Sequence, residues 1–230
     1  MRECDQQGFV LRRQDYGDTS LLVDIFTRGQ GRFRVVAKGA KSGKASRARV
    51  LQPFSSLQLG WSGRSELKTL TQSEPVSTYR LDKQATICGF YVNELLWNFL
   101  QVQDPHEELY DVYEHCLVML AEGEDLELAL RNFEFFLLKD TGYETILDMD
   151  AETGDALNPE HTYRFELENG LVKTSERENA YPGRLFLAIA NNDLTEAPAR
   201  QLAKKITRQV IHHRMDGKEL HSRKWFMTGR

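Results

Sequence analysis

The spacing of apolar residues changes near residue 80, and this change divides the chain into two regions. Before it, short apolar or alternating runs are separated by turn residues, a pattern typical of β-strands. After it, apolar residues recur at intervals of three and four, which places them along one stripe of an α-helix. We therefore expect an α+β protein, with a β-domain over residues 1–80 and a mainly α-helical domain over residues 81–230.

The first region contains five candidate strands. Glycine-containing turns at residues 28–31 and 62–64 would each connect two of them as a hairpin. Five short strands in about eighty residues predict a small closed barrel, and the five-stranded OB-fold is the commonest barrel of this size that binds nucleic acid. The candidate strands cover residues 8–13, 21–27, 32–38, 57–61 and 67–71.

The second region begins with three candidate helices. Apolar stripes over residues 87–102 and 109–120 predict the first two. Residues 126–141 carry apolar side chains on two faces, which predicts a helix near the centre of the helical domain, with Gly142 as its C-cap.

The helical pattern is interrupted over residues 143–182, where we expect a small irregular insert. Asn169 and Gly170 separate two short apolar-containing runs and predict a β-hairpin within it. Two further helices, over residues 184–191 and 198–215, and a short basic tail complete the second region.

The formal net charge of −4 is the sum of a basic first segment, an acidic middle segment and a basic last segment. Residues 1–80 hold 14 lysines and arginines against 7 acidic residues, residues 81–199 hold 7 against 25, and residues 200–230 hold 9 against 2. Salt screens charges over about 8–10 Å, so each segment presents its own field to a partner. The basic first segment is therefore compatible with nucleic-acid binding despite the acidic total.

Sequence motifs for catalysis and for metal binding are incomplete. Residues 39–45 resemble a phosphate-binding loop, but the glycine spacing is one residue short and Ala45 replaces the magnesium-binding hydroxyl. Asp148, Asp150 and Glu152 begin like a calcium loop that the following residues do not continue. The three cysteines are far apart and odd in number. We therefore expect no catalytic residue, no cofactor and no metal site.

No apolar run approaches the roughly 20 residues that a membrane-spanning helix needs. Residues 1–9 also lack the apolar run of a secretory signal. These features predict a cytoplasmic protein that has no membrane partner.

The third candidate strand carries alternating cations. Arg32, Arg34 and Lys38 should project to one face of the barrel, while Phe33 and Val35 project to the other. Such a basic face suits the phosphates of a nucleic acid, and the alternative interpretation is a solvated basic face that serves only solubility. With the cations that follow the strand, the expected DNA-binding residues are Arg32, Arg34, Lys38, Lys41, Lys44, Arg47 and Arg49.

Several segments resemble the RecO family of DNA-repair proteins. Those in the first region are residues 8–12, 19–27, 31–41 and 51–54, and those in the second are residues 91–96, 130–134, 142–143 and 217–223. The resemblance implies an OB-fold followed by a helical domain, acting in recombinational gap repair as a non-enzymatic mediator. It also implies binding to single- and double-stranded DNA, annealing of complementary strands, and, with RecR, loading of RecA onto DNA coated with single-stranded DNA-binding protein.

The resemblance extends to individual residues. Arg32, Arg34, Lys38 and Lys41 match expected DNA contacts. Many relatives carry a four-cysteine zinc knuckle after the central helix, whereas residues 148–163 here contain no cysteine, so we expect no zinc. A nucleoid-associated location in the cytoplasm is also implied. Three residues match a segment that could receive the acidic C-terminal tail of the single-stranded DNA-binding protein: Arg131, Phe135 and Leu138.

The basic C-terminal segment has two possible partners, since it could extend the DNA path or receive an acidic peptide. Two other functions stay open on sequence grounds: an OB-fold RNA-binding assembly factor, and a metal-dependent nuclease that uses carboxylates of the acidic middle segment. The expected partner-binding residues of the C-terminal segment are Lys204, Lys205, Arg208 and Arg223.

Overall fold

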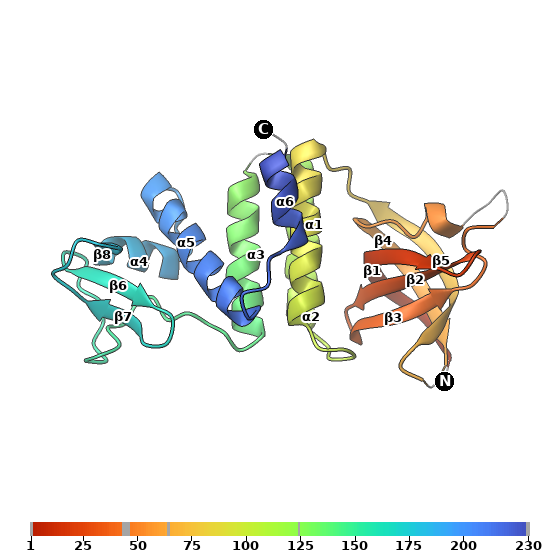
Figure 1. Ribbon diagram of the computed structural model, residues 1–230, viewed down its shortest axis with the longest axis horizontal. Coiled ribbons are helices and arrows are strands. Elements are labelled where there is room, and N and C mark those ends of the chain that lie inside the picture. The colour runs from red at the N-terminus through yellow and green to blue at the C-terminus, as the bar shows by residue number, and fades with distance from the viewer. Residues whose placement is uncertain (1, 43–46, 64, 124, 229–230) are drawn as a thin grey trace. The chain divides into compact units, whose positions relative to one another are not determined.

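Five strands near the N-terminus close into a barrel in the computed structural model, which describes residues 2–42, 47–63, 65–123 and 125–228 (Figure 1). Their order around the barrel is β1-β2-β3-β5-β4. Neighbouring strands are antiparallel except for β3 and β5, which pair in parallel. The strands are β1 (Arg2–Tyr16), β2 (Ser20–Thr27), β3 (Gly31–Ala37), β4 (Ser55–Ser62) and β5 (Lys68–Thr78), and a 3₁₀ turn, η1 (Arg47–Arg49), lies between β3 and β4.

The barrel interior is filled by apolar side chains from alternate positions of the strands. Val23 and Ile25 of β2 and Phe33 and Val35 of β3 are completely buried there. The ring of Phe33 packs on that of Trp61 with centroids 4.6 Å apart. Period-2 alternation thus gives each strand one core face, and the prediction of a closed five-stranded barrel with an OB-fold type of architecture is confirmed.

Three helices belong to the same compact unit as the barrel: α1 (Lys83–Phe99), α2 (Glu107–Glu122) and α6 (His221–Thr228). The Asp82 carboxylate caps α1 by accepting a hydrogen bond from the amide of Ala85 at 2.8 Å. Gly123 ends α2 in the left-handed conformation, with a φ of 72°.

Helix α6 starts on a carboxylate of α1. The two Glu94 oxygens accept hydrogen bonds from the backbone amides of His221 and Ser222, at 2.8 and 2.9 Å, and Ser222 Oγ donates another at 2.7 Å. A negative charge at a helix N-terminus satisfies amides that have no partner within the helix. The segment that was expected to be a basic tail therefore contains a docked helix.

Aromatic side chains join the barrel to α2. Phe9 and Phe26 point away from the barrel interior but are completely buried, because they meet the rings of Tyr110 and Tyr113. The Tyr113 hydroxyl donates to Asn93 Oδ1 at 2.7 Å, and Asn93 Nδ2 donates to the carbonyl of Leu11 at 3.0 Å. Burial raises the pKa of Tyr113 well above its ordinary value, so the hydroxyl keeps its proton.

The remaining helices and a small sheet form a second unit. The first unit comprises residues 1–126 and 220–230, and the second comprises residues 127–219. Strand β6 pairs with both β7 and β8, so the predicted hairpin is present with one additional strand. The elements are α3 (Leu126–Asp140), β6 (Thr162–Glu166), β7 (Gly170–Lys173), β8 (Ala180–Pro182), α4 (Gly183–Ala190) and α5 (Ala197–Arg214).

The division into units differs from the division expected from sequence. The change of period near residue 80 marks the end of the barrel, but α1 and α2 are grouped with the barrel because their apolar faces are buried against it. In the described part of the chain, no helix is both long enough and apolar enough to span a bilayer.

Candidate nucleic-acid interface

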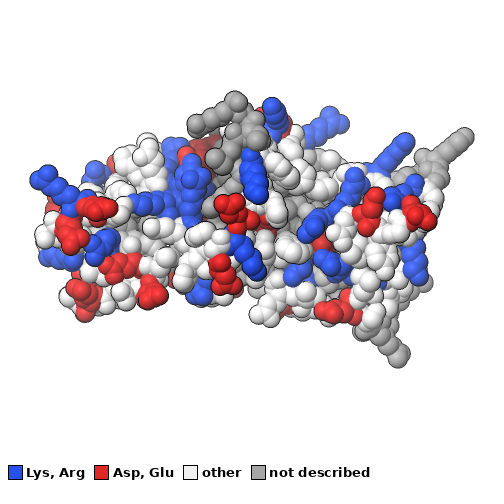
Figure 2. Space-filling model, in the orientation of Figure 1, with Lys and Arg blue, Asp and Glu red and all other residues white. Residues whose placement is uncertain are grey.

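Strand β3 has the two faces predicted from its alternation. Phe33 and Val35 lie in the barrel core, while Arg32 and Arg34 lie on the outer face, opposite Phe26 and Asp24 of β2. Basic side chains are prominent over the barrel, on the right of Figure 2. The geometry of individual side chains then decides which of these cations are available to a ligand.

Arg34 is paired with Asp24 across the two strands. Its Nε and Nη2 donate to the two carboxylate oxygens of Asp24 at 2.8 and 3.2 Å. The Asp24 side chain is only 6% exposed, whereas that of Arg34 is 40% exposed. A bidentate pair fixes the guanidinium plane and offsets its charge locally, so Arg34 presents less net charge than its position suggests.

Arg32 is bound to the end of α1. Its Nε and Nη2 donate to the carbonyl of Leu100 at 3.2 and 3.0 Å. Burial lowers the pKa of Arg32 from its ordinary value, while the charge of Asp24 acts to raise it and that of Arg34 to lower it. Arg32 therefore supports the junction between β3 and α1, and its half-buried position limits its reach.

Described residues of the loop after β3 are held by contacts with cations of the loop itself and with β1. Arg47 donates to the carbonyl of Lys38 at 3.2 Å, and Lys41 Nζ lies 3.2 Å from Asp15 and 3.3 Å from the carbonyl of Gly17. Arg13 donates to the carbonyls of Ala48 and Leu51, at 2.6 and 3.2 Å. These contacts give the described residues on either side of positions 43–46 a defined place on the barrel.

Two of the predicted cations keep their donors available. Of the six candidates that the structure describes, only Lys38 and Arg49 make no side-chain hydrogen bond or ion pair with another described residue, and both are exposed. Lys44 lies outside the described residues. Lys38 and Arg49 are thus the cations of this set best placed to meet phosphate.

The residues expected to bind a partner tail are less accessible. Arg131 is 3% exposed and Leu138 is 1% exposed, while Phe135 is half-buried. Arg131 Nη2 donates to the buried carboxylate of Glu134 at 2.5 Å, and Glu134 also accepts a hydrogen bond from the hydroxyl of Thr207. The charge of Arg131 is therefore matched inside the structure.

The cations of α5 are partly engaged as well. Lys204 Nζ lies 2.7 Å from Glu127, and Lys205 Nζ donates to Asn179 and Tyr181 at 2.6 and 3.2 Å. Arg208 is exposed. The side chain of Arg223 lies outside the described residues, so its predicted role has no structural description.

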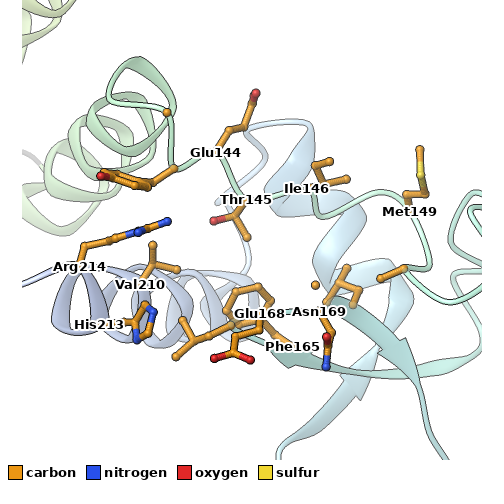
Figure 3. Close-up of a pocket in the computed structure, with 16 residues that line it drawn as sticks. Glu144, Thr145, Ile146, Met149, Phe165, Glu168, Asn169, Val210, His213 and Arg214 are labelled. Atoms are coloured by element: carbon orange, nitrogen blue, oxygen red, sulfur yellow. The ribbon is translucent and has the colours of Figure 1, made fainter. Parts of the chain in front are cut away.

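The second unit contains an open cavity of about 540 Å³ between the segment after α3, the β6–β7 hairpin and the end of α5 (Figure 3). The Arg214 guanidinium lies 3.6 Å from the centroid of the Tyr143 ring in its wall. The carboxylates of Glu144 and Glu168, opposite in charge to Arg214, line the same space. The cavity wall therefore does not favour a ligand of either charge.

The calcium-like segment folds as a turn. The Asp150 carboxylate accepts a hydrogen bond from the amide of Glu152 at 3.0 Å. Within the described ranges, no group of three or more His, Cys, Asp or Glu side chains is arranged to hold a metal ion. The expectation that the protein uses no metal stays a prediction.

Comparison with known proteins identifies the family. The family described as "Recombination protein O N terminal" matches residues 1–79, and the one described as "Recombination protein O C terminal" matches residues 80–224. The chain belongs to the RecO family. Its general role is therefore in DNA repair. The two RecO matches meet where the barrel ends, at the position that the change of period indicates.

Curated relatives cover nearly the whole chain. It is 42% identical to the DNA repair protein RecO of Methylococcus capsulatus over 222 residues, which are 96% of this chain and 92% of that protein. It is 41% identical to the DNA repair protein RecO of Haemophilus influenzae over 223 residues, 96% of this chain and 94% of that protein. The RecO resemblance inferred from short motifs is therefore confirmed.

Sequence reasoning overlooked two arginines of β1. Arg13 anchors the basic loop, and Arg12 lies opposite Asp24 beyond a register shift that follows Val10. The sequence did contain a sign of their role, because two adjacent arginines directly follow the apolar residues 9–11 of this strand. Simple alternation would have placed only one of them on the outer face.

Proposed function

We propose that this RecO-family chain binds single- and double-stranded DNA through the outer surface of its barrel and anneals complementary strands. With RecR it would help load RecA onto DNA coated with single-stranded DNA-binding protein, in the cytoplasm and without covalent chemistry. One observation carries the proposal: Lys38 and Arg49 are exposed and unpaired in the described structure, and contacts of Arg13 and Lys41 hold described residues near them.

The mechanism would be charge neutralisation. Each phosphate that meets a cation releases condensed counterions, which favours binding at low salt. Two strands held on the same basic surface repel one another less and can pair. Because Arg13 and Lys41 hold described residues near Lys38 and Arg49 in place, these two cations lose less conformational entropy when DNA binds.

The acidic tail of the single-stranded DNA-binding protein would dock on the second unit. Phe135 is partly accessible, and beneath it the buried Nε and Nη1 of Arg131 have no hydrogen-bond partner in the described part of the chain. Arg208 is exposed on α5 and would attract an acidic segment. A docked tail would raise the local concentration of the mediator on coated DNA.

Replacing both Lys38 and Arg49 with glutamine should weaken binding to single-stranded DNA about tenfold at moderate salt. Two phosphate contacts are lost, so the slope of log affinity against log salt should become shallower by about 1.4. Anisotropy titrations of a labelled oligonucleotide across a KCl series measure both quantities. Lys173→Gln with Arg177→Gln removes the same charges from exposed positions of the second unit and is the matched control. Equal losses in the two double variants would contradict the assignment.

Replacing Asp24 with asparagine should tighten DNA binding and reduce stability. The amide cannot offset the charge of Arg34, so the barrel surface becomes more positive and the salt slope steeper by up to about 0.7. Asparagine can accept only one of the two hydrogen bonds from Arg34 and turns a donor toward it at the other, so the free energy of unfolding should fall by about 1–3 kcal/mol. Titration and urea denaturation check the two effects, and an unchanged affinity would show that Arg34 does not face the nucleic acid.

Annealing tests the wider proposal. The protein should accelerate pairing of complementary oligonucleotides without nucleotide or metal, both bare and coated with single-stranded DNA-binding protein. No acceleration over protein-free controls would reject it. Preference for RNA in competition with matched DNA, or cleavage of DNA with magnesium or manganese, would instead favour one of the two other functions left open by the sequence.

A further inference from the structure

Arg12 is a cation of the barrel surface that the sequence pattern did not select. It is exposed on β1 and lies opposite Asp24, which itself lies opposite Arg34 on β3, so the three residues form a row across the sheet. In the part of the chain that the structure describes, the Arg12 side chain makes no hydrogen bond and no ion pair. Its donors therefore remain available to a ligand.

The Arg12 guanidinium lies over the ring of Trp97. The guanidinium carbon lies 5.3 Å from the centroid of the Trp97 ring, and that of Arg32 lies 5.9 Å from the same ring. Trp97 is half-buried on α1, and its Nε1 is buried. The ring is thus an anchored apolar surface rather than a mobile side chain.

Stacking leaves the hydrogen-bonding edge of a guanidinium accessible. A cation over an aromatic ring is attracted by the π-electrons and keeps its N–H groups in the guanidinium plane. A planar fork held in this way can contact two phosphate oxygens with less loss of side-chain entropy than a freely rotating arginine. Arg34, in contrast, already uses Nε and Nη2 to bind Asp24.

We propose that Arg12 contacts the phosphate backbone of a single-stranded nucleic acid, with Trp97 as its positioning residue. The inference rests on the proposed function and extends that interface from β3 and the basic loop across the sheet to β1. Phosphate would meet the outward N–H edge of Arg12, and Trp97 would act only by orienting it.

The test is an anisotropy titration of labelled oligothymidylate with the full chain over a KCl series. Arg12→Gln should weaken binding about fivefold and make the salt slope shallower by about 0.7, because one phosphate contact is lost. Arg177→Gln removes one exposed arginine from the second unit and should leave both quantities near the wild-type values.

Trp97→Leu should weaken binding about threefold but preserve the salt slope, because Arg12 keeps its charge and loses only its fixed orientation. Trp97→Phe keeps an aromatic ring and should restore most of the affinity. Circular dichroism and thermal unfolding verify that each variant is folded. If Trp97→Leu does not fold, Arg12→Gln and Trp97→Phe decide the question, since Arg12 is exposed and phenylalanine preserves a ring.

The possible failures are distinguishable. Wild-type affinity and slope in Arg12→Gln would overturn this inference while leaving DNA binding by the loop intact. A Trp97→Phe variant as weak as Trp97→Leu would overturn the positioning role of the ring. Absence of binding by the wild-type chain at low salt would overturn the proposed function and this inference together.

Discussion

Replacing Glu134 with leucine should lower the free energy of unfolding by about 3–5 kcal/mol, because the change leaves the charge of Arg131 buried without its partner. Glu134 is completely buried and accepts hydrogen bonds from Arg131 and Thr207. Guanidinium denaturation followed by circular dichroism measures the effect.

The matched control replaces both partners. Arg131→Met with Glu134→Leu should regain most of the lost stability, because neither charge is then desolvated alone. A Glu134→Leu variant within about 1 kcal/mol of wild type would show that the pair is hydrated in solution. The double variant also tests the predicted partner role of Arg131: it should stay folded and bind the acidic tail peptide more weakly.

Replacing Phe26 with alanine should lower the free energy of unfolding by a similar amount, about 3–5 kcal/mol. The side chain lies outside the barrel core but is completely buried, with its ring 5.5 Å from that of Tyr110 and 6.2 Å from that of Tyr113. Alanine would leave a cavity between the sheet and α2. Urea denaturation followed by tryptophan fluorescence provides the measurement.

Tyr16→Ala is the comparison for Phe26→Ala. Tyr16 is an aromatic residue of the same barrel, but it is 49% exposed, so its removal should change stability by about 0.5 kcal/mol or less. Similar losses in the two variants would mean that α2 does not cover Phe26 in solution.

Local periodicity predicted most of the secondary structure because each element buries one regular face. The five barrel strands, the first three helices and the Asn-Gly hairpin follow from such patterns. Helix α6 was not predicted, since it is short and depends on Glu94, which is more than a hundred residues away in sequence. Strand β8 has only three residues and pairs with β6 through similarly non-local contacts.

The site was predicted less completely than the fold. Alternation placed Arg32 and Arg34 on the outer face, but it could not show that Leu100 and Asp24 already occupy their donors. Sequence spacing also could not bring Trp97 to Arg12, because that contact depends on how α1 packs on the barrel. The sequence pattern locates a basic surface, while side-chain packing determines which of its cations have donors free to bind a ligand.

The start of α6 on Glu94 has a consequence for biosynthesis. The chain leaves the first unit at Leu126 and re-enters it at Leu220, so the second unit is an insertion between two parts of the first. The ribosome must therefore release the entire insertion before Ser222 can reach the Glu94 carboxylate. Until then, the barrel and its first two helices form a nascent intermediate in which the face of α1 that α6 later covers stays uncovered.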